Sequence, residues 1–105
     1  MKWRGKKLGI LLSSGPGNPG FRHGVRLAQV ALQEGVAVYL YCIDDAVWGL
    51  VDPELQSLKA CGLNLYACAY GARRRSLLLS DKAAFAGLTV VSDMIAATDR
   101  FVSFN

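Results

Sequence analysis

The segment that indicates the fold most clearly is residues 62–74, which read GLNLYACAYGARR. A short apolar run that begins after a glycine is typical of a buried strand, so we predict a strand over residues 63–67. Cys68 then lies at the carboxyl end of that strand, and the arginine-bearing segment 71–80 predicts a short helix. A strand followed directly by a helix is the unit from which parallel sheets are built.

The same alternation continues on both sides of this segment. Asp52 is predicted to cap a helix that begins at Pro53, and Ser92 is predicted to cap a helix that runs to about Thr98. Five strands alternating with helices predict one parallel sheet with right-handed crossovers and helices on both faces. The other predicted strands are residues 8–12, 36–42, 88–91 and 101–104, and the other predicted helices are 21–34 and 53–61.

Length and composition restrict the class of protein. The chain has 105 residues, 52% of them hydrophobic, which is enough for a single domain over residues 1–105. No apolar stretch approaches the ~20 residues of a membrane span, and the apolar run after the basic N-terminal residues is too short for a signal peptide. We therefore expect a cytoplasmic protein.

Charge and cysteine content exclude further classes of site. Three cysteines without paired spacing argue against a disulfide framework, and a single histidine argues against zinc. The net charge of +4 is modest and local, which argues against nucleic-acid binding. The basic residues gather in two groups, Lys2, Arg4, Lys6 and Lys7, and Arg73, Arg74 and Arg75.

Cys68 is the residue best placed for chemistry. Ligands of parallel sheets bind at the carboxyl ends of the strands, so the relevant loops are residues 13–20, 44–48, 68–71 and 92–93. A helix start and nearby arginines both favour a thiolate, which is the reactive form of cysteine. We assign Arg73 and Arg74 as thiolate-stabilising residues. The alternative is that Cys68 is a buried, inert residue, as we expect of Cys42 and Cys61.

The first predicted loop contains GPGNPG at residues 15–20, which matches a dinucleotide-binding pattern. Its two prolines remove amide donors that a pyrophosphate would use. The loop is therefore either a tight turn or a weak anion site at a helix start. His23 follows in the first helical turn and is either a surface residue or an acid–base group. The possible anion-binding residues are Ser14, Gly15, Gly17 and Asn18.

Three segments together resemble the DsrE/TusD-like (DsrE/DsrF-like) family of sulfur-relay proteins. They are the glycine-proline turn at residues 15–19, the strand, cysteine and paired arginines at residues 62–74, and the final strand at residues 98–104. The second segment is the specific one. It departs from the expected motif at Gly71 and Ser76, and the chain is shorter than typical relay subunits around residues 44–54.

The resemblance implies a fold, a chemistry and partners. The fold would be a three-layer α/β/α sandwich with a five-stranded parallel sheet, a flavodoxin-like variant. Cys68 would carry sulfane sulfur as a persulfide, without a cofactor or a metal. Partners would be a second copy of the chain in a trimer or hexamer, related subunits in a mixed complex, and proteins that donate and accept sulfur.

Three hypotheses about function remain open. The first is a sulfur carrier or sulfurtransferase subunit that works through Cys68. The second is a non-catalytic binding or assembly module with the same fold. The third is a small nucleotide- or phosphate-binding domain that uses the loop Gly15–Gly20.

Overall fold

One parallel sheet forms the centre of the molecule. The computed structural model describes residues 2–78 and 80–105. The strands are β1 (Lys7–Leu12), β2 (Ala37–Cys42), β3 (Asn64–Cys68), β4 (Ala84–Ala86) and β5 (Arg100–Phe104). Their order is β4-β3-β2-β1-β5, and every neighbouring pair is parallel. The predicted five-stranded parallel sheet is confirmed.

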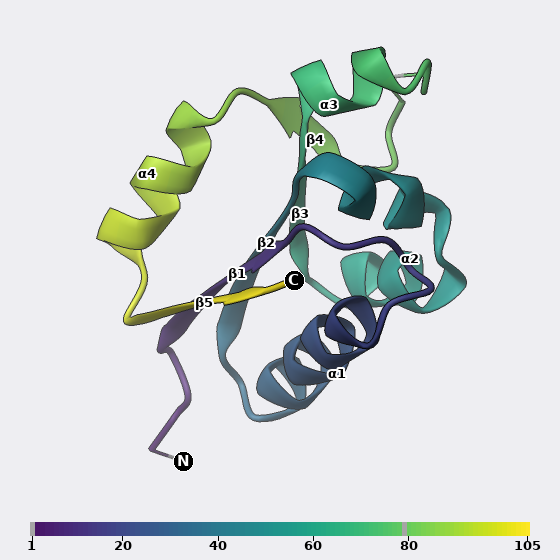
Figure 1. Cartoon of the computed structure of the whole chain (residues 1–105). Helices are drawn as coiled ribbons and strands as arrows, with labels where there is room; N and C mark the ends of the chain where they lie inside the picture. The colour runs from purple at the N-terminus through teal and green to yellow at the C-terminus, as the bar shows by residue number, and fades with distance from the viewer. Residues whose placement is uncertain (1, 79) are drawn as a thin grey trace.

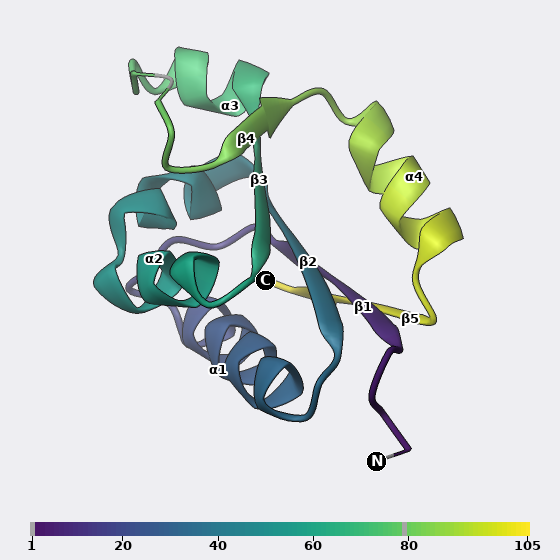
Figure 2. The same cartoon turned by 180° about the vertical axis from the view of Figure 1, so that it is seen from behind.

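Helices cover both faces of this sheet. Helices α1 (Pro19–Gln33) and α2 (Pro53–Ala60) lie on one face, and α4 (Thr89–Ala97) lies on the other (Figures 1 and 2). The chain adds β2, β3 and β4 in one direction from β1 and then returns to place β5 on the far side of β1. Since crossovers are right-handed, this reversal moves α4 to the opposite face. The predicted three-layer α/β/α sandwich is confirmed.

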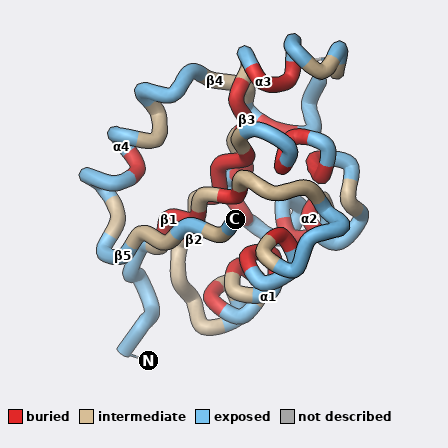
Figure 3. Tube along the Cα trace, viewed as in Figure 1, coloured by how far each residue is buried: buried red, intermediate tan, exposed pale blue. Residues whose placement is uncertain are grey.

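The two faces are buried to different extents. Side chains alternate along a strand, so Leu40 and Cys42 of β2 face α1 while Tyr41 faces α4. The large core lies under α1 and α2, whereas the core under α4 has three buried members, Tyr41, Cys68 and Met94. Figure 3 shows the same contrast as buried residues under α1 and a largely exposed α4. Cys68 thus belongs to the less covered face.

The fourth strand and the helix after it differ from the prediction. Residues 88–91 do not form a strand, because β4 is Ala84–Ala86 and α4 already begins at Thr89. Ser92 lies inside α4 and does not cap it. The run Leu-Thr-Val-Val is rich in strand-forming residues, but a short apolar run does not distinguish a strand from a helix. Packing of α4 on β1 and β5 decides the outcome.

Two short elements lie at the carboxyl ends of β2 and β3. Helix α3 spans Ala69–Arg74, so it begins directly after Cys68 and ends earlier than the predicted helix over residues 71–80. Ser76 follows with a φ of 56°, a left-handed conformation that ends the helix. A 3-10 helix, η1 (Asp44–Val51), follows β2 where the sequence predicts a loop. Helix α3 contacts η1, and the site described below lies beside both.

Asp52 joins α1 to α2, and we expect Asp52→Ala to lower the free energy of unfolding by about 0.5–2 kcal/mol at neutral pH. Its carboxylate accepts a hydrogen bond from Leu55 N at 3.1 Å, which confirms the predicted cap, and it pairs with Arg22 of α1. Burial by itself raises the pKa of Asp52, but the hydrogen bonds from Arg22 and from Leu55 N lower it overall.

A carboxyl whose pKa is lowered by folding stabilises the fold while it is ionised in both states. The contribution of Asp52 is therefore complete above its ordinary pKa and is lost as the pH falls through the lower pKa of the folded state. Urea unfolding at neutral and at acidic pH measures the difference. Asp52→Asn keeps a capping side chain. An equal loss in the free energy of unfolding for Asp52→Ala and for Asp52→Asn would show that the cap contributes nothing.

Candidate functional site

A cavity of about 630 Å³ opens at the carboxyl ends of β2 and β3. The connection after β3 passes through α3, which contacts η1, whereas the connection after β4 leads to α4 on the opposite face. Ligands in open α/β sheets bind where neighbouring connections diverge in this way. The lining residues come from all of these segments: Ile43, Asp44, Asp45, Trp48, Cys68, Tyr70, Gly71, Arg74, Arg75 and Leu88.

Cys68 is the one cysteine among the residues that line this cavity. It is the last residue of β3 and the N-cap of α3, and its Sγ accepts a hydrogen bond from Gly71 N at 3.3 Å. A backbone N–H that points at sulfur stabilises the thiolate more than the thiol. A Cβ on Gly71 would lie 3.6 Å from the sulfur, so glycine leaves the space beside the sulfur open. Only 4% of Cys68 is exposed, and the cavity lies at its accessible side.

The three consecutive arginines lie in three different environments. Arg73 is exposed and is not among the residues that line the cavity. Arg74 lines it and donates a hydrogen bond to the Tyr70 hydroxyl at 3.4 Å, with its guanidinium 5.7 Å from the ring centre. Arg75 also lines the cavity and is the most buried of the three. The structure therefore brings Arg74, but not Arg73, to the cavity that holds Cys68.

Arg75 belongs to the basic triplet but not to the predicted thiolate-stabilising pair. Its guanidinium donates to Gly71 O at 3.2 Å and to Asp45 at 3.0 Å. Both its Nη1 and the sulfur of Cys68 lie within 4 Å of the point where a Cβ on Gly71 would sit. Helical spacing could have found it, because residues 68, 71 and 75 fall on one face of a helix. Arg75 thus holds positive charge close to the sulfur, partly balanced by Asp45.

We expect Arg75→Gln to slow the alkylation of Cys68 by iodoacetamide at neutral pH, by on the order of threefold to fivefold. The effect is limited because Asp45 already offsets part of the charge of Arg75. Asp45→Asn should change the rate in the opposite direction, since it removes the negative charge. Peptide mapping after limited labelling measures the rates, with Arg73→Gln as the control. Equal rates for Arg75→Gln and Arg73→Gln would contradict the assignment.

Large apolar side chains surround the mouth of the cavity. Trp48, Tyr70 and Leu88 line it and are 48%, 66% and 56% exposed. They come from η1, from α3 and from the residue before α4. Exposed apolar side chains that gather around the mouth of a cavity are typical of a surface that binds another molecule.

The other two cysteines have different surroundings. Cys42 is fully buried, and burial raises the pKa of its thiol to about 12, so it stays protonated. Cys61 follows α2, is exposed, and lies on a different element from the cavity. Of the three free thiols, Cys68 is the one in the cavity with the cations.

The glycine-rich loop lies beside η1 but outside this cavity. Its residues Ser14, Gly15, Gly17 and Asn18 are not among the lining residues, although Gly15 approaches the backbone of Asp45. Ser13 Oγ donates to Asn105 Oδ1 at 2.8 Å, and the Asn105 carbonyl packs directly against Gly20 in the first turn of α1. Anion binding by this loop stays a prediction. His23 is exposed on α1.

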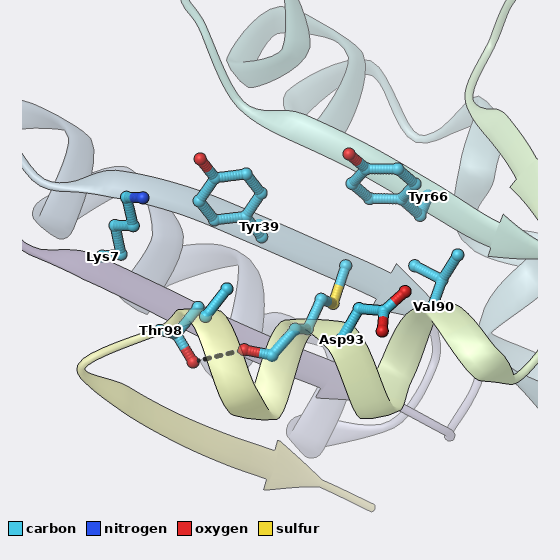
Figure 4. A pocket seen from close by; sticks show the side chains of 8 residues that line it. Lys7, Tyr39, Tyr66, Val90, Asp93 and Thr98 are labelled. Carbon is cyan, nitrogen blue, oxygen red and sulfur yellow. Dashed lines mark hydrogen bonds between the residues drawn. The ribbon is translucent and has the colours of Figure 1, made fainter.

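A second, smaller groove of about 270 Å³ lies between α4 and the sheet. Figure 4 shows Tyr39 and Tyr66 on neighbouring strands, both facing α4. Thr98 closes one end by donating to Met94 O at 2.7 Å. The groove results from the incomplete cover that the single helix α4 gives to this face. Its lining residues are Lys7, Tyr39, Tyr66, Val90, Asp93, Met94, Ala97 and Thr98.

Solved structures show the same fold. The ychN protein from E. coli superposes with a TM-score of 0.76 at 17% identity, covering 94% of this chain and 98% of that one. A conserved protein of unknown function from Bacteroides thetaiotaomicron, BT1422, superposes with a TM-score of 0.76 at 13% identity, covering 93% and 94%. No protein-family model and no curated protein sequence matches the chain. The comparisons therefore show that the chain shares the fold of these two proteins, and they show the fold alone.

Two further features bear on the class of site. Within residues 2–78 and 80–105, no three or more His, Cys, Asp or Glu side chains gather as metal ligands would. Over the same residues, no helix has the length and the apolar character needed to cross a membrane.

Proposed function

We propose that the protein carries sulfane sulfur as a persulfide on Cys68 and passes it between partner proteins. The observation that supports this most strongly is the position of the Cys68 sulfur. It lies at a strand end, accepts the Gly71 N–H, and borders a cavity that also contains Arg74 and Arg75. Such surroundings favour a thiolate and a bound anionic sulfur, and the resemblance to sulfur-relay proteins agrees with them.

The proposed transfer needs the Cys68 thiolate and a donor persulfide, R–S–SH. The thiolate attacks the outer sulfur of the donor, a new S–S bond forms on Cys68, and the donor S–S bond breaks. The electron pair of the broken bond leaves on the donor as R–S⁻, and the proton stays on the transferred sulfur. Delivery is the same exchange in reverse, with an acceptor thiolate as nucleophile and Cys68 as leaving group. The exchange is redox-neutral and needs no cofactor.

The cavity suits a partner that brings sulfur on its own cysteine. The sulfur of Cys68 is nearly buried, so the donor sulfur has to enter the cavity. Trp48, Tyr70 and Leu88 offer an apolar rim against which the donor protein would pack, while the arginines would face the persulfide anion.

Intact-mass spectrometry tests the proposal. The whole chain is incubated with a cysteine desulfurase and cysteine, freed from small molecules, and weighed with and without a reductant. The expected result is a gain equal to the mass of one sulfur atom, which the reductant removes. The absence of any gain, with a known sulfur acceptor loaded in parallel, would overturn the proposal.

A non-catalytic assembly module with this fold is the second candidate function. The observation that favours it is the low exposure of Cys68, 4%, which a structural cysteine would also have. In that case the rim around the cavity would serve only to bind a partner. The same mass experiment separates the two candidates, because an assembly module gains no sulfur.

We also propose that the chain associates with itself, and we expect light scattering to give a mass of at least twice that of one chain at micromolar concentration. Large apolar side chains are exposed at several places outside the cavity, among them Trp3, Val30, Leu78 and Ile95. A mass equal to one chain would contradict the prediction. An assembly that keeps a constant mass at higher concentration and dissociates on dilution would support self-association.

A further inference from the structure

Tyr41 has a buried hydroxyl, and the proposed sulfur transfer gives this residue no role. It lies on β2, is fully buried, and belongs to the same small core as Cys68 and Met94. Its hydroxyl donates a hydrogen bond to Ala86 O at 3.0 Å. Figure 1 shows that β3 separates the two strands joined by this bond.

The strand register places this hydroxyl next to the sulfur. Tyr41 is paired with Tyr66 on β3, and Cys68 is the next residue of β3 on the same face. Cys68 is in turn paired with Ala86 on β4. The tyrosine side chain that starts at β2 and reaches Ala86 O therefore crosses β3 at Cys68. The hydroxyl therefore lies beside Cys68 on the α4 face of the sheet, in the small core that the two residues share with Met94.

The chemistry of a hydroxyl suits both states of the sulfur. It has one proton, which it donates to Ala86 O here, and lone pairs that remain free to accept a hydrogen bond from the weak S–H donor of a neutral thiol. When the sulfur is negative, the same hydroxyl can turn its proton toward it, and charge-assisted hydrogen bonds are stronger than neutral ones. Burial, then the charge of Cys68 and a hydrogen bond with it, raise the pKa of Tyr41 above its ordinary value. The proton is therefore retained while Cys68 is ionised.

We propose that Tyr41 is the positioning residue for the inner sulfur of Cys68, moving its hydrogen bond from Ala86 O to that sulfur whenever the sulfur bears negative charge. This assignment rests on the proposed function, because it gives Tyr41 a task in sulfur transfer. Once the transferred sulfur has lost its proton to solvent, the charge of the loaded state lies on that outer sulfur, in the cavity. The inner sulfur carries the negative charge before Cys68 attacks and regains it when Cys68 leaves, so Tyr41 stabilises the nucleophile for loading and the leaving group in delivery.

The test is the pH profile of Cys68 alkylation by iodoacetamide in the full chain, compared between the wild type, Tyr41→Phe and Tyr39→Phe. Tyr39 lies on the same strand and the same face, and it lines the groove under α4 instead of the Cys68 cavity. We expect Tyr41→Phe to move the profile to higher pH, with alkylation about tenfold slower at neutral pH and the plateau at high pH unchanged. Tyr39→Phe should follow the wild type.

A purely structural role for Tyr41 predicts a different result. The titratable groups other than Tyr41 that face Cys68 stay in place in Tyr41→Phe, so they do not move the pH profile of Cys68 alkylation. Loss of the bond to Ala86 O alone would loosen β4 and raise the rate at every pH with an unchanged midpoint. That outcome, or superimposed profiles, would overturn the proposal. The other groups are Asp44, Asp45, Tyr70, Arg74 and Arg75 around the cavity and Cys42 beside Tyr41.

A second measurement does not depend on the folding of Tyr41→Phe. The chain has four tyrosines, and labelling with 3-fluorotyrosine gives each a ¹⁹F resonance. Tyrosine-to-phenylalanine changes at 39, 66 and 70 assign the resonance of Tyr41 by elimination. In the wild type the Tyr41 resonance should shift with pH as Cys68 ionises, and in Cys68→Ser it should stay fixed. The same pH dependence of this resonance in both proteins would overturn the proposal.

Sulfur loading of the same wild-type preparation separates this inference from the proposed function. A profile that moves in Tyr41→Phe while the wild type takes up no sulfur supports the contact and overturns the function. Loading by a wild type whose profile is the same as that of Tyr41→Phe supports the function and overturns the role of Tyr41.

Discussion

Cys68→Ser is expected to reduce sulfur uptake to the background of a chain without an activated thiol. Serine is close in size to cysteine, so the fold and the hydrogen bond from Gly71 N should be retained, but a hydroxyl cannot accept sulfane sulfur as a persulfide. Of the remaining thiols, Cys42 is fully buried with a pKa of about 12, and Cys61 lies outside the cavity. Uptake of radioactive sulfur from labelled cysteine and a desulfurase measures the loss.

Cys61→Ser is the matched control for this experiment. It makes the same substitution at an exposed thiol, and it should leave uptake at the level of the wild type. If Cys61→Ser removes the label and Cys68→Ser does not, exposure and not the cavity decides which thiol reacts. Circular dichroism of both variants shows whether the fold is unchanged.

Phe21→Ala is expected to lower the free energy of unfolding by about 3–5 kcal/mol. Phe21 is fully buried in the first turn of α1, and its ring packs directly against the backbone of Gly49 in η1. A cavity beneath η1 would remove these contacts. Since a domain of this size has only about 5–15 kcal/mol of stability, the loss is a large part of the total. The change also reaches the site, because η1 carries Asp45 and Trp48.

Urea unfolding of Phe21→Ala beside Val30→Ala measures this effect. Val30 lies on the same helix but is 48% exposed, so its replacement should change stability by no more than about 0.5 kcal/mol. The urea midpoint for Phe21→Ala should fall, while the slope of the free energy of unfolding against urea concentration stays the same. The slope is unchanged because the surface exposed on unfolding hardly changes. Similar midpoints for the two variants would show that the contact between Phe21 and η1 contributes little.

Much of the fold is predictable from the sequence because most elements carry a clear pattern. The strands at residues 8–12, 36–42 and 63–67 are apolar runs, and Asp52 and Pro53 mark a helix start that the structure confirms. The fourth strand is not predictable in the same way. Ala84–Ala86 has three residues, lies at the edge of the sheet beside β3, and consists mainly of alanine, which is depleted in strands, while the strand-like run at residues 88–91 belongs to α4.

The site is predictable in part for the same reason. Cys68 is found because it ends a recognisable strand, and strand ends are where ligands bind. Arg75 depends on where α3 begins, and a predicted start at residue 71 gives no reason to choose it over Arg73. Tyr41 depends on the register of β2, β3 and β4, and predicting β4 at residues 88–91 hides the contact with Ala86. Local pattern thus locates Cys68, while its neighbours in the structure follow from strand pairing and helix phase.

The position of the transferred sulfur in the wild-type chain shows whether Cys68 is the residue that carries it. Native protein is loaded by a desulfurase with cysteine, its persulfides are trapped by alkylation, and the peptides are sequenced by mass spectrometry. Cys61 is exposed and Cys68 is 4% exposed, so chance labelling and a built site give opposite results. We expect the added sulfur on Cys68, with Cys61 alkylated as a plain thiol. Added sulfur on Cys61, with none on Cys68, would contradict it.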